Sequence, residues 1–299
     1  MGLIAVLTLV VGLVGDMYRP AATAAIADIV AEPDRERSFA LLFWAINLGF
    51  SVASVAAGLL LGRFGFGTLF VLDAATTLAF GLLALRFVPE TRPAGPADAR
   101  ARLGDPLRLL VSDRLLLAAT SVVLIYAVLY AQATVLLPLA IRHVGLPNSA
   151  FGYVIAINGV LFIVLQPLLL GWLDRAPRRA TLPGGLALVG VGLSVTPFCH
   201  AAWQFAATVV VWTVGEIFVA GSFQAVIAAL APPSMRGRYA GALGLAWGAS
   251  DLLAPLLGTG SFAVSPALSA AGCLVAGLGS AAAQYALLGA IARRREAGR

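Results

Sequence analysis

Residues 115–141 read LLLAATSVVLIYAVLYAQATVLLPLAI, a run without Asp, Glu, Lys or Arg between Arg114 and Arg142. An α-helix needs about 20 apolar residues to cross a hydrocarbon core about 30 Å thick, so this run is long enough to do so. Comparable charge-free stretches lie between Arg37 and Arg63, Arg142 and Asp174, Arg179 and Glu216, and Asp251 and Arg293. The pattern predicts an integral membrane protein with several helices.

The composition agrees with a membrane location. Charged residues make up 11% of the 299 residues and hydrophobic residues 60%, whereas soluble domains average about 25% and about 45–50%. A soluble chain of this length still needs a polar surface, and the few charges here occur in clusters. A soluble enzyme is therefore excluded.

Turn signals and charges divide the chain into nine apolar segments. We interpret all nine as helices, because a lipid-exposed backbone must satisfy its own hydrogen bonds and no segment shows strand-like alternation. The predicted spans are Gly2–Val30, Phe39–Gly62, Gly67–Phe87, Leu115–Ile141, Ala150–Leu173, Ala180–Phe198, Trp203–Leu230, Tyr239–Phe262 and Pro266–Ala292.

Arginine predicts the orientation, since all 20 basic residues are Arg. The odd-numbered connections and the C-terminal tail hold every arginine except Arg63 and Arg142, which lie in even connections, and Arg19, which lies inside a span. Cytoplasmic loops carry the excess of basic residues. We therefore expect a protein of the cytoplasmic membrane with a cytoplasmic C-terminus and residue 1 on the outer side.

The net charge of +6 is explained by these loops, which leave no basic face for a nucleic acid. The two cysteines, Cys199 and Cys273, form neither a disulfide framework nor a metal-binding spacing. We expect no metal and no cofactor, the proton gradient being the energy source. The expected partners are a small-molecule substrate and the lipid bilayer, and the expected state is a monomer.

An internal repeat indicates two halves. A shift of about 200 residues places Gly15-Asp16 over Gly215-Glu216, and Arg35-x-Arg37 over Arg236-x-Arg238 one residue further on. The Pro-, Gly- and Arg-rich segment 88–114 is typical of a flexible linker. We predict a remnant of an N-terminal half (1–87), a cytoplasmic linker (88–114) and a C-terminal half of six helices (115–299).

At these residues the chain resembles the major facilitator superfamily, in particular its bacterial proton-coupled, drug-exporter-like branch. The stretches that carry the resemblance are GDMYRPAATAAIADIV and DRERSFALLFWAINLGF (15–30 and 34–50), and WTVGEIF and APPSMRGRYAGALGLAWG (212–218 and 231–248). The resemblance implies a twelve-helix fold of which the nine predicted helices correspond to helices four to twelve, the first three being absent.

The resemblance also implies a cytoplasmic gate. The segment Asp174-Arg175-Ala176-Pro177-Arg178-Arg179 is similar to the family's D-R-x-G-R-[KR] loop, with Pro177 in place of the glycine. An ordinary charged turn that obeys the positive-inside rule is the alternative. Asp28 occupies the position of the family's acid at the end of helix four, and we expect it to lack its partner in this chain.

The family's antiporter signature on helix five is G-x-x-x-G-P-x-x-G-G. This chain has Gly49-x-x-x-Ala53-Ser54-x-x-Ala57-Gly58, so the Gly-Pro is lost, and proline appears instead in the second-half copy at Pro255, followed by Gly258. Small residues at this spacing allow helices to pack closely, so we expect Gly49, Gly58, Pro255 and Gly258 to lie at helix contacts.

Ionisable residues inside spans are candidates for function, because a charge at the bilayer centre costs about 2.5–3.5 kcal/mol on insertion scales. Asp16 and Arg19 are three residues apart and can pair, either structurally or until a proton or substrate competes. Glu216 has no Arg within a helical turn, so burial should favour proton uptake near neutral pH. The repeat places it opposite Asp16, and it is our first candidate for proton coupling.

Asp251 either binds a cationic substrate or hydrogen-bonds across helices, whereas Asp73 is expected to be structural. Polar and aromatic residues of the spans are candidates for the lining of a substrate cavity, although any single one is more often a packing residue than a ligand contact. They are Trp44, Asn47, Tyr126, Tyr130, Gln132, Asn158, Gln166, Trp212 and Trp247.

Three functions follow as hypotheses. The preferred one is a secondary transporter that moves a small amphipathic molecule by alternating access, with proton-coupled export. The second is a truncated fragment that transports nothing, because alternating access needs both halves. The third is an intramembrane aspartyl protease, which the arginine beside Asp16 and the repeat both disfavour. No H-E-x-x-H or G-x-S-x-G pattern supports metal or serine hydrolysis.

Overall fold

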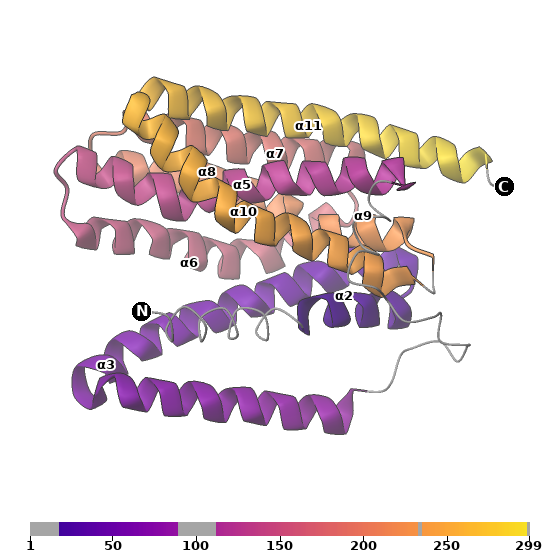
Figure 1. Ribbon diagram of the computed structural model, residues 1–299, viewed down its shortest axis with the longest axis horizontal. Coiled ribbons are helices and arrows are strands. Elements are labelled where there is room, and N and C mark those ends of the chain that lie inside the picture. The colour runs from indigo at the N-terminus through magenta and orange to yellow at the C-terminus, as the bar shows by residue number, and fades with distance from the viewer. Residues whose placement is uncertain (1–17, 89–111, 233–234, 298–299) are drawn as a thin grey trace.

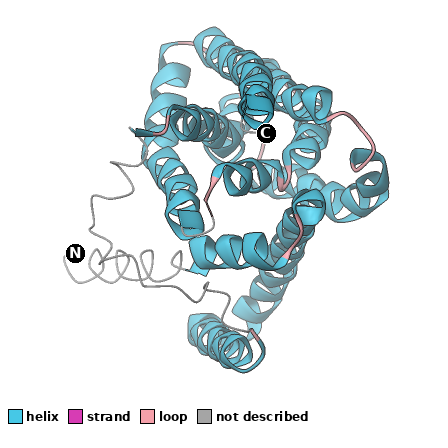
Figure 2. Cartoon of the chain, turned by 90° about the vertical axis from the view of Figure 1, so that its right-hand side faces the viewer, coloured by secondary structure: helices cyan, strands magenta, loops and turns pink. Residues whose placement is uncertain are grey.

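The computed structural model describes residues 18–88, 112–232 and 235–297, and within these ranges the chain is helical (Figure 1). Figure 2 views the bundle nearly along the helix axes and shows helices joined by loops, without a strand in the described residues. The elements are α2 (Tyr18–Ile29), η1 (Glu32–Asp34), α3 (Arg35–Phe87), α5 (Arg114–His143), α6 (Asn148–Leu173), α7 (Arg178–Val195), η2 (Thr196–Phe198), α8 (Ala202–Val219), α9 (Ser222–Leu230), α10 (Arg236–Val264) and α11 (Pro266–Ala297).

Seven helical segments of the described residues are long and apolar enough to cross a membrane. Predicted spans Leu115–Ile141, Ala150–Leu173 and Tyr239–Phe262 correspond to α5, α6 and α10, with ends that differ by a few residues. Pro266–Ala292 corresponds to α11, and Ala180–Phe198 to α7 with η2. Of the first predicted span only α2 is described, so Asp16 lies outside the described residues, and of Arg19 and Gly58 only the backbone is described.

The second and third predicted spans are two arms of one kinked helix, α3. Gly65 lies at the kink with φ 73° and ψ 178°, a conformation that glycine adopts without steric cost. The first arm packs against α6 and α9, whereas the second arm, Gly67–Phe87, runs along the lower edge of Figure 1 apart from the bundle. Its hydrophobic residues, for example Phe70 and Leu85, are exposed.

The seventh predicted span, Trp203–Leu230, contains a break that was not expected. Helix α8 ends at Val219 and α9 begins at Ser222, because Gly221 takes a positive φ of 75°. A Cβ atom at Gly221 would lie 2.8 Å from the carbonyl oxygen of Glu36 and 2.8 Å from the carbonyl carbon of Phe39. The break therefore lets the backbone of the second half touch the first turn of α3.

The core lies in the bundle of α5, α7, α8, α10 and α11. Leu116, Leu186, Phe205 and Trp212 are almost completely buried there. Helices α7 and α11 run side by side (Figure 1) and approach so closely that a Cβ atom at Gly190 would lie 2.5 Å from the Cα atom of Gly277. The close approach of small residues holds this half together.

Candidate functional site

Glu216 lies in the last turn of α8 with only 1% of its surface exposed. The Tyr130 hydroxyl of α5 donates a hydrogen bond to Glu216 Oε1 (2.8 Å), and Asn158 Nδ2 of α6 donates to Glu216 Oε2 (2.7 Å). Asn158 Nδ2 also donates to Thr213 Oγ1 (3.0 Å), one turn before Glu216. Both carboxyl oxygens are thus satisfied by groups from other helices, and no arginine among the described residues lies within ion-pair distance.

An aromatic cluster lies beside Glu216 Oε1, the oxygen that Tyr130 bonds. It consists of Tyr126, Tyr130, Trp212, Trp247 and Phe223. The Tyr126 and Tyr130 rings are stacked with centroids 5.9 Å apart, and the edge of Trp247 meets Tyr130 at 6.2 Å. Trp212 meets Tyr130 at 6.2 Å, and Phe223 of α9 lies 5.1 Å from Tyr126. The cluster joins α5, α8, α9 and α10 around one buried carboxyl group.

The structure brings together the predicted residues Glu216, Tyr126, Tyr130, Asn158, Trp212 and Trp247. Thr213 and Phe223 were not predicted; the signal for Thr213 was its position three residues before Glu216, on the same helix face.

Other predicted cavity residues lie in helix contacts instead. Gln132 Nε2 donates to the carbonyl oxygen of Ala254 (3.2 Å), and Trp44 Nε1 donates to that of Ile163 (3.0 Å). Asn47 bonds its own helix at Phe43, and Gln166 donates to the carbonyl oxygen of Ala40 (2.6 Å). Asp251 and Asp73 are exposed on α10 and on the second arm of α3.

Some of the residues predicted to lie at helix contacts do so in the structure, and others do not. Gly258 of α10 faces Gln132, and a side chain there would overlap the Gln132 amide, so this helix contact is as expected. Pro255 lies inside α10, one turn before. Gly49 is exposed, and a Cβ atom there would meet nothing within 4 Å in the described part of the chain, so its expected contact is not found.

Ion pairs join α2 and α3 to the second half at the arginine-rich end. Asp28 pairs with Arg236 of α10, a second-half partner that the sequence did not predict. The sequence prediction considered only a partner in the family's first-half loop, whereas the fold brings the end of α2 to the start of α10. Both side chains are mostly buried, at 14% and 17% exposure.

Two further pairs involve the predicted loop. Arg178 pairs with Glu36, which also accepts a hydrogen bond from Ser222 of α9, and Asp174 lies 3.8 Å from Arg37. Predicted loop residues Arg175 and Arg179 are exposed. We call the three pairs Asp28–Arg236, Glu36–Arg178 and Arg37–Asp174 the arginine-end contacts. Glu36, Arg37 and Arg236 were missed as partners, although the repeat contained the two arginines.

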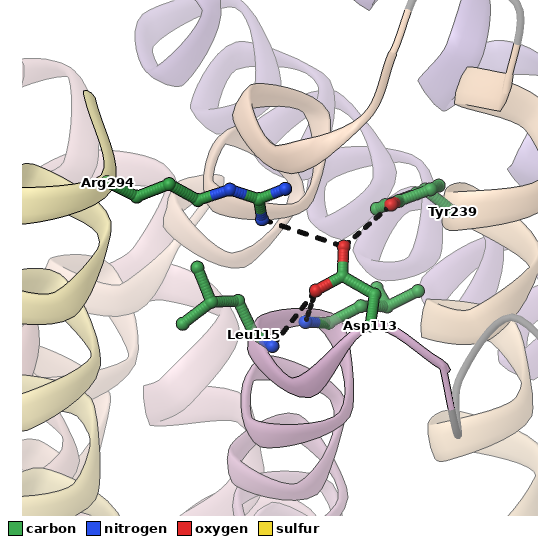
Figure 3. Close-up of polar contacts among 5 residues, drawn as sticks. Asp113, Leu115, Tyr239 and Arg294 are labelled. Atoms are coloured by element: carbon green, nitrogen blue, oxygen red, sulfur yellow. Dashed lines mark hydrogen bonds and ion pairs between the residues drawn. The ribbon is translucent and has the colours of Figure 1, made fainter. Parts of the chain in front are cut away.

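A further polar contact joins three helices of the second half (Figure 3). Asp113 Oδ1 caps α5 by accepting from the backbone N–H groups of Leu115 (3.0 Å) and Leu116 (3.3 Å). Asp113 Oδ2 accepts from the Tyr239 hydroxyl (2.8 Å) and lies 3.7 Å from Arg294 of α11. Burial alone would raise the Asp113 pKa, but the Tyr239 and backbone hydrogen bonds together with the Arg294 charge lower it below 3.8.

The sequence profile of the Major Facilitator Superfamily matches residues 1–255. The chain belongs to the Major Facilitator Superfamily. It is therefore a multi-pass membrane protein of a family of secondary transporters, not of enzymes, and the intramembrane-protease alternative is removed. The all-helical fold predicted from the charge-free runs is confirmed.

Relatives within the Major Facilitator Superfamily include two with named functions. A Na(+), Li(+), K(+)/H(+) antiporter of Planococcus maritimus is 24% identical over 272 residues, covering 82% of this chain and 64% of that protein. Multidrug resistance protein MdtH of Enterobacter sp. (strain 638) is 24% identical over 241 residues, covering 79% of this chain and 59% of that protein.

A third relative, the uncharacterized MFS-type transporter YhjO of Bacillus subtilis (strain 168), is 29% identical over 262 residues. The match covers 85% of this chain and 62% of that protein. The chain thus spans about three fifths of the length of each of these three relatives.

Proposed function

We propose that this protein exports a small amphipathic organic molecule in exchange for protons by alternating access, and that Glu216 carries the coupled proton. The supporting observation is the buried Glu216 carboxyl group, which three helices enclose and hydrogen-bond. An ionisable side chain inside a membrane helix is costly, which favours a functional role. The name of the Planococcus relative, a cation/proton antiporter, supports the choice of coupling ion.

The hydrogen bonds assign different roles to the two carboxyl oxygens. Asn158 Nδ2 can only donate, and it does so to Glu216 Oε2 and to Thr213. A proton on Oε2 would therefore oppose this amide. A proton on Oε1 requires only that the Tyr130 hydroxyl rotate from donor to acceptor. Glu216 is thus suited to take up and release a proton at Oε1 while Asn158 holds the other oxygen in place.

The aromatic cluster is suited to an amphipathic substrate. Rings at this spacing provide apolar contact, and the faces of Trp and Tyr attract cations. Trp212 Nε1 is buried and has no hydrogen-bond acceptor among the described residues, so a ligand that enters when the cluster opens would find a free donor there. In this proposal the substrate lies against Trp212 and Trp247 and competes with the proton for Glu216. The printed name of the Enterobacter relative, a multidrug resistance protein, is consistent with such a substrate.

The remaining sequence predictions belong to the same proposal. Asp16 and Arg19 would be the first-half counterparts of Glu216, and Asp251 would face the substrate path. Segments 1–87 and 115–299 would move as halves about the linker 88–114. The arginine-end contacts would form the cytoplasmic gate, with the C-terminus in the cytoplasm and residue 1 outside. We further propose that the transporter acts as a monomer.

Transport by the full chain in proteoliposomes tests the proposal, with ethidium as the amphipathic probe and a pH dye inside the vesicles. We expect ethidium-dependent proton flux that Glu216→Gln abolishes. Asp73→Asn is the matched control, because it also neutralises an acid within a membrane helix but at an exposed position. Proton flux that survives Glu216→Gln would refute the coupling role.

Two further outcomes of the same measurement separate the alternatives. Proton flux driven by Na⁺ and not by ethidium would replace the organic substrate with a metal cation. No flux with any probe in the wild-type chain would favour the transport-inactive fragment.

A further inference from the structure

Helices α7 and α11 form a groove at the arginine-rich end of the bundle. The groove has a volume of about 490 Å³ and is lined by Arg179, Tyr285, Ala286, Gly289, Ala292 and Arg293. The five α11 positions recur at the spacing of one helix face. The small residues Ala286, Gly289 and Ala292 leave the space, which is within the usual range of ligand pockets.

The groove concentrates positive charge, and no acid among the described side chains forms an ion pair with it. Arg179 and Arg293 make no ion pair in the described residues and are exposed. Their chain neighbours are engaged instead: Arg178 pairs with Glu36, and Arg294 pairs with Asp113 (Figure 3). The fold therefore pairs one arginine of each adjacent pair with an acid and leaves the other in the groove.

The start of α7 adds a third positive element. This helix begins at Arg178, and its N-cap residue, Pro177, supplies no side-chain hydrogen bond to the first turn. The first backbone N–H groups of a helix lack partners within the helix and attract anions. Arg179 lies in the first turn of α7, so the positive end of this helix lies beside the groove that Arg179 and Arg293 line.

The position of the groove at the membrane interface indicates which class of anion it binds. Tyr285, 59% exposed, lies eight residues before Arg293, or about 12 Å nearer the membrane centre along α11. Tyrosine favours the interface between headgroups and hydrocarbon, and basic pockets between membrane helices bind anionic headgroups. We propose that the groove binds the phosphate headgroup of one anionic phospholipid, with Arg179 and Arg293 holding the phosphate and Tyr285 facing the glycerol region.

Native mass spectrometry of the detergent-purified full chain tests this proposal, with phosphatidylglycerol as the probe and phosphatidylcholine as the neutral lipid. An arginine near a membrane surface contributes about a fivefold gain in affinity for anionic lipid. We expect Arg179→Gln and Arg293→Gln each to weaken binding of the first phosphatidylglycerol about fivefold, with phosphatidylcholine unaffected. Arg179→Lys, which keeps the charge, should retain most of the affinity.

Arg175→Gln is the matched control, because Arg175 is an exposed arginine of the same connection that does not line the groove. Equal losses from Arg175→Gln and Arg179→Gln would mean diffuse surface charge and overturn the proposal. Inorganic phosphate that binds with the same dependence on Arg179 and Arg293 would assign the groove to a free anion. Equal affinity of the wild-type chain for both lipids would also overturn the proposal. Thermal unfolding of each variant establishes that it is folded.

Discussion

Two of the three arginine-end contacts, Asp28–Arg236 and Arg37–Asp174, should differ strongly in energy, because they differ in burial. Asp28 and Arg236 are 14% and 17% exposed, whereas Asp174 and Arg37 are 40% and 58% exposed and 3.8 Å apart. Removal of one partner from a buried ion pair costs about 3–5 kcal/mol, since the other charge stays buried without its partner. Exposed ion pairs contribute only about 0.2–1 kcal/mol.

We expect Asp28→Asn to lower the free energy of unfolding by about 3 kcal/mol, at the low end of that range because some solvent reaches both side chains. The Arg236 Nε atom already lacks an acceptor among the described residues, so its guanidinium would have little to replace Asp28. Asp174→Asn should cost about 0.5 kcal/mol or less. In a chain of this size the first change corresponds to a fall in melting temperature of about 6 °C.

Tryptophan fluorescence during thermal unfolding of the detergent-purified chain measures both effects. Two double-mutant cycles, Asp28→Asn with Arg236→Gln and Asp174→Asn with Arg37→Gln, isolate the pairwise energies. We expect a coupling above about 2 kcal/mol for the first and below about 0.5 kcal/mol for the second. Equal coupling energies would refute the argument from burial.

Three further changes test the packing and the Asp113 contact by the same thermal measurement. Gly190→Ala should lower the free energy of unfolding by about 1–3 kcal/mol, because its Cβ atom would lie 2.5 Å from the α11 backbone. Gly184→Ala on the same helix should not lower it, because a Cβ atom there would meet open space. Gly221→Ala should cost clearly more than Gly145→Ala: both residues have positive φ, but only the first would clash with α3. Asp113→Ala should cost about 2–3 kcal/mol through the lost helix cap and an unpaired tyrosine hydroxyl. The pKa of Asp113 in the folded state is lowered below 3.8, so its ionised form stabilises the fold above that pH. This stabilisation is lost as the pH falls through the pKa of the folded state. We expect the loss in the wild type and not in Asp113→Asn.

Charge-free runs predicted the membrane helices well, because lipid imposes the same condition on every residue of a span. The run 115–141 gave α5 with ends at Arg114 and His143, where charge resumes. The break between α8 and α9 is not marked by charged residues in the sequence. Residues 222–230 are as apolar as the helix before them, and the break depends on a contact between Gly221 and α3, which lie far apart in the sequence.

Glu216 was predictable for the same reason, since a charge inside an apolar run stands out. The polar residues that would contact Glu216 were less predictable. Tyr126 and Tyr130 are one turn apart on α5 and face the cluster together. Gln132, two residues further on, is rotated by about 200° and bonds the carbonyl oxygen of Ala254 outside the cluster. The sequence contains this periodicity, but it does not say which face of α5 meets Glu216. That choice is made by the packing of whole helices.

Glu216 and the arginine-end contacts are linked by two elements of the second half. Along the chain, the last three residues of α8 and the break separate Glu216 from Ser222. Ser222 donates a hydrogen bond to the Glu36 carboxylate, which pairs with Arg178. Along α10, Arg236 and the cluster residue Trp247 are about 16 Å apart on one helix. A proton on Glu216 can favour one state of the gate only if it binds more tightly in that state. In the proposed mechanism the break at Gly221 would allow α9 to separate from α3 without unwinding α8. If coupling follows this route, disruption of the Gly221 contact should weaken the arginine-end contacts while the Tyr130 and Asn158 hydrogen bonds to Glu216 persist.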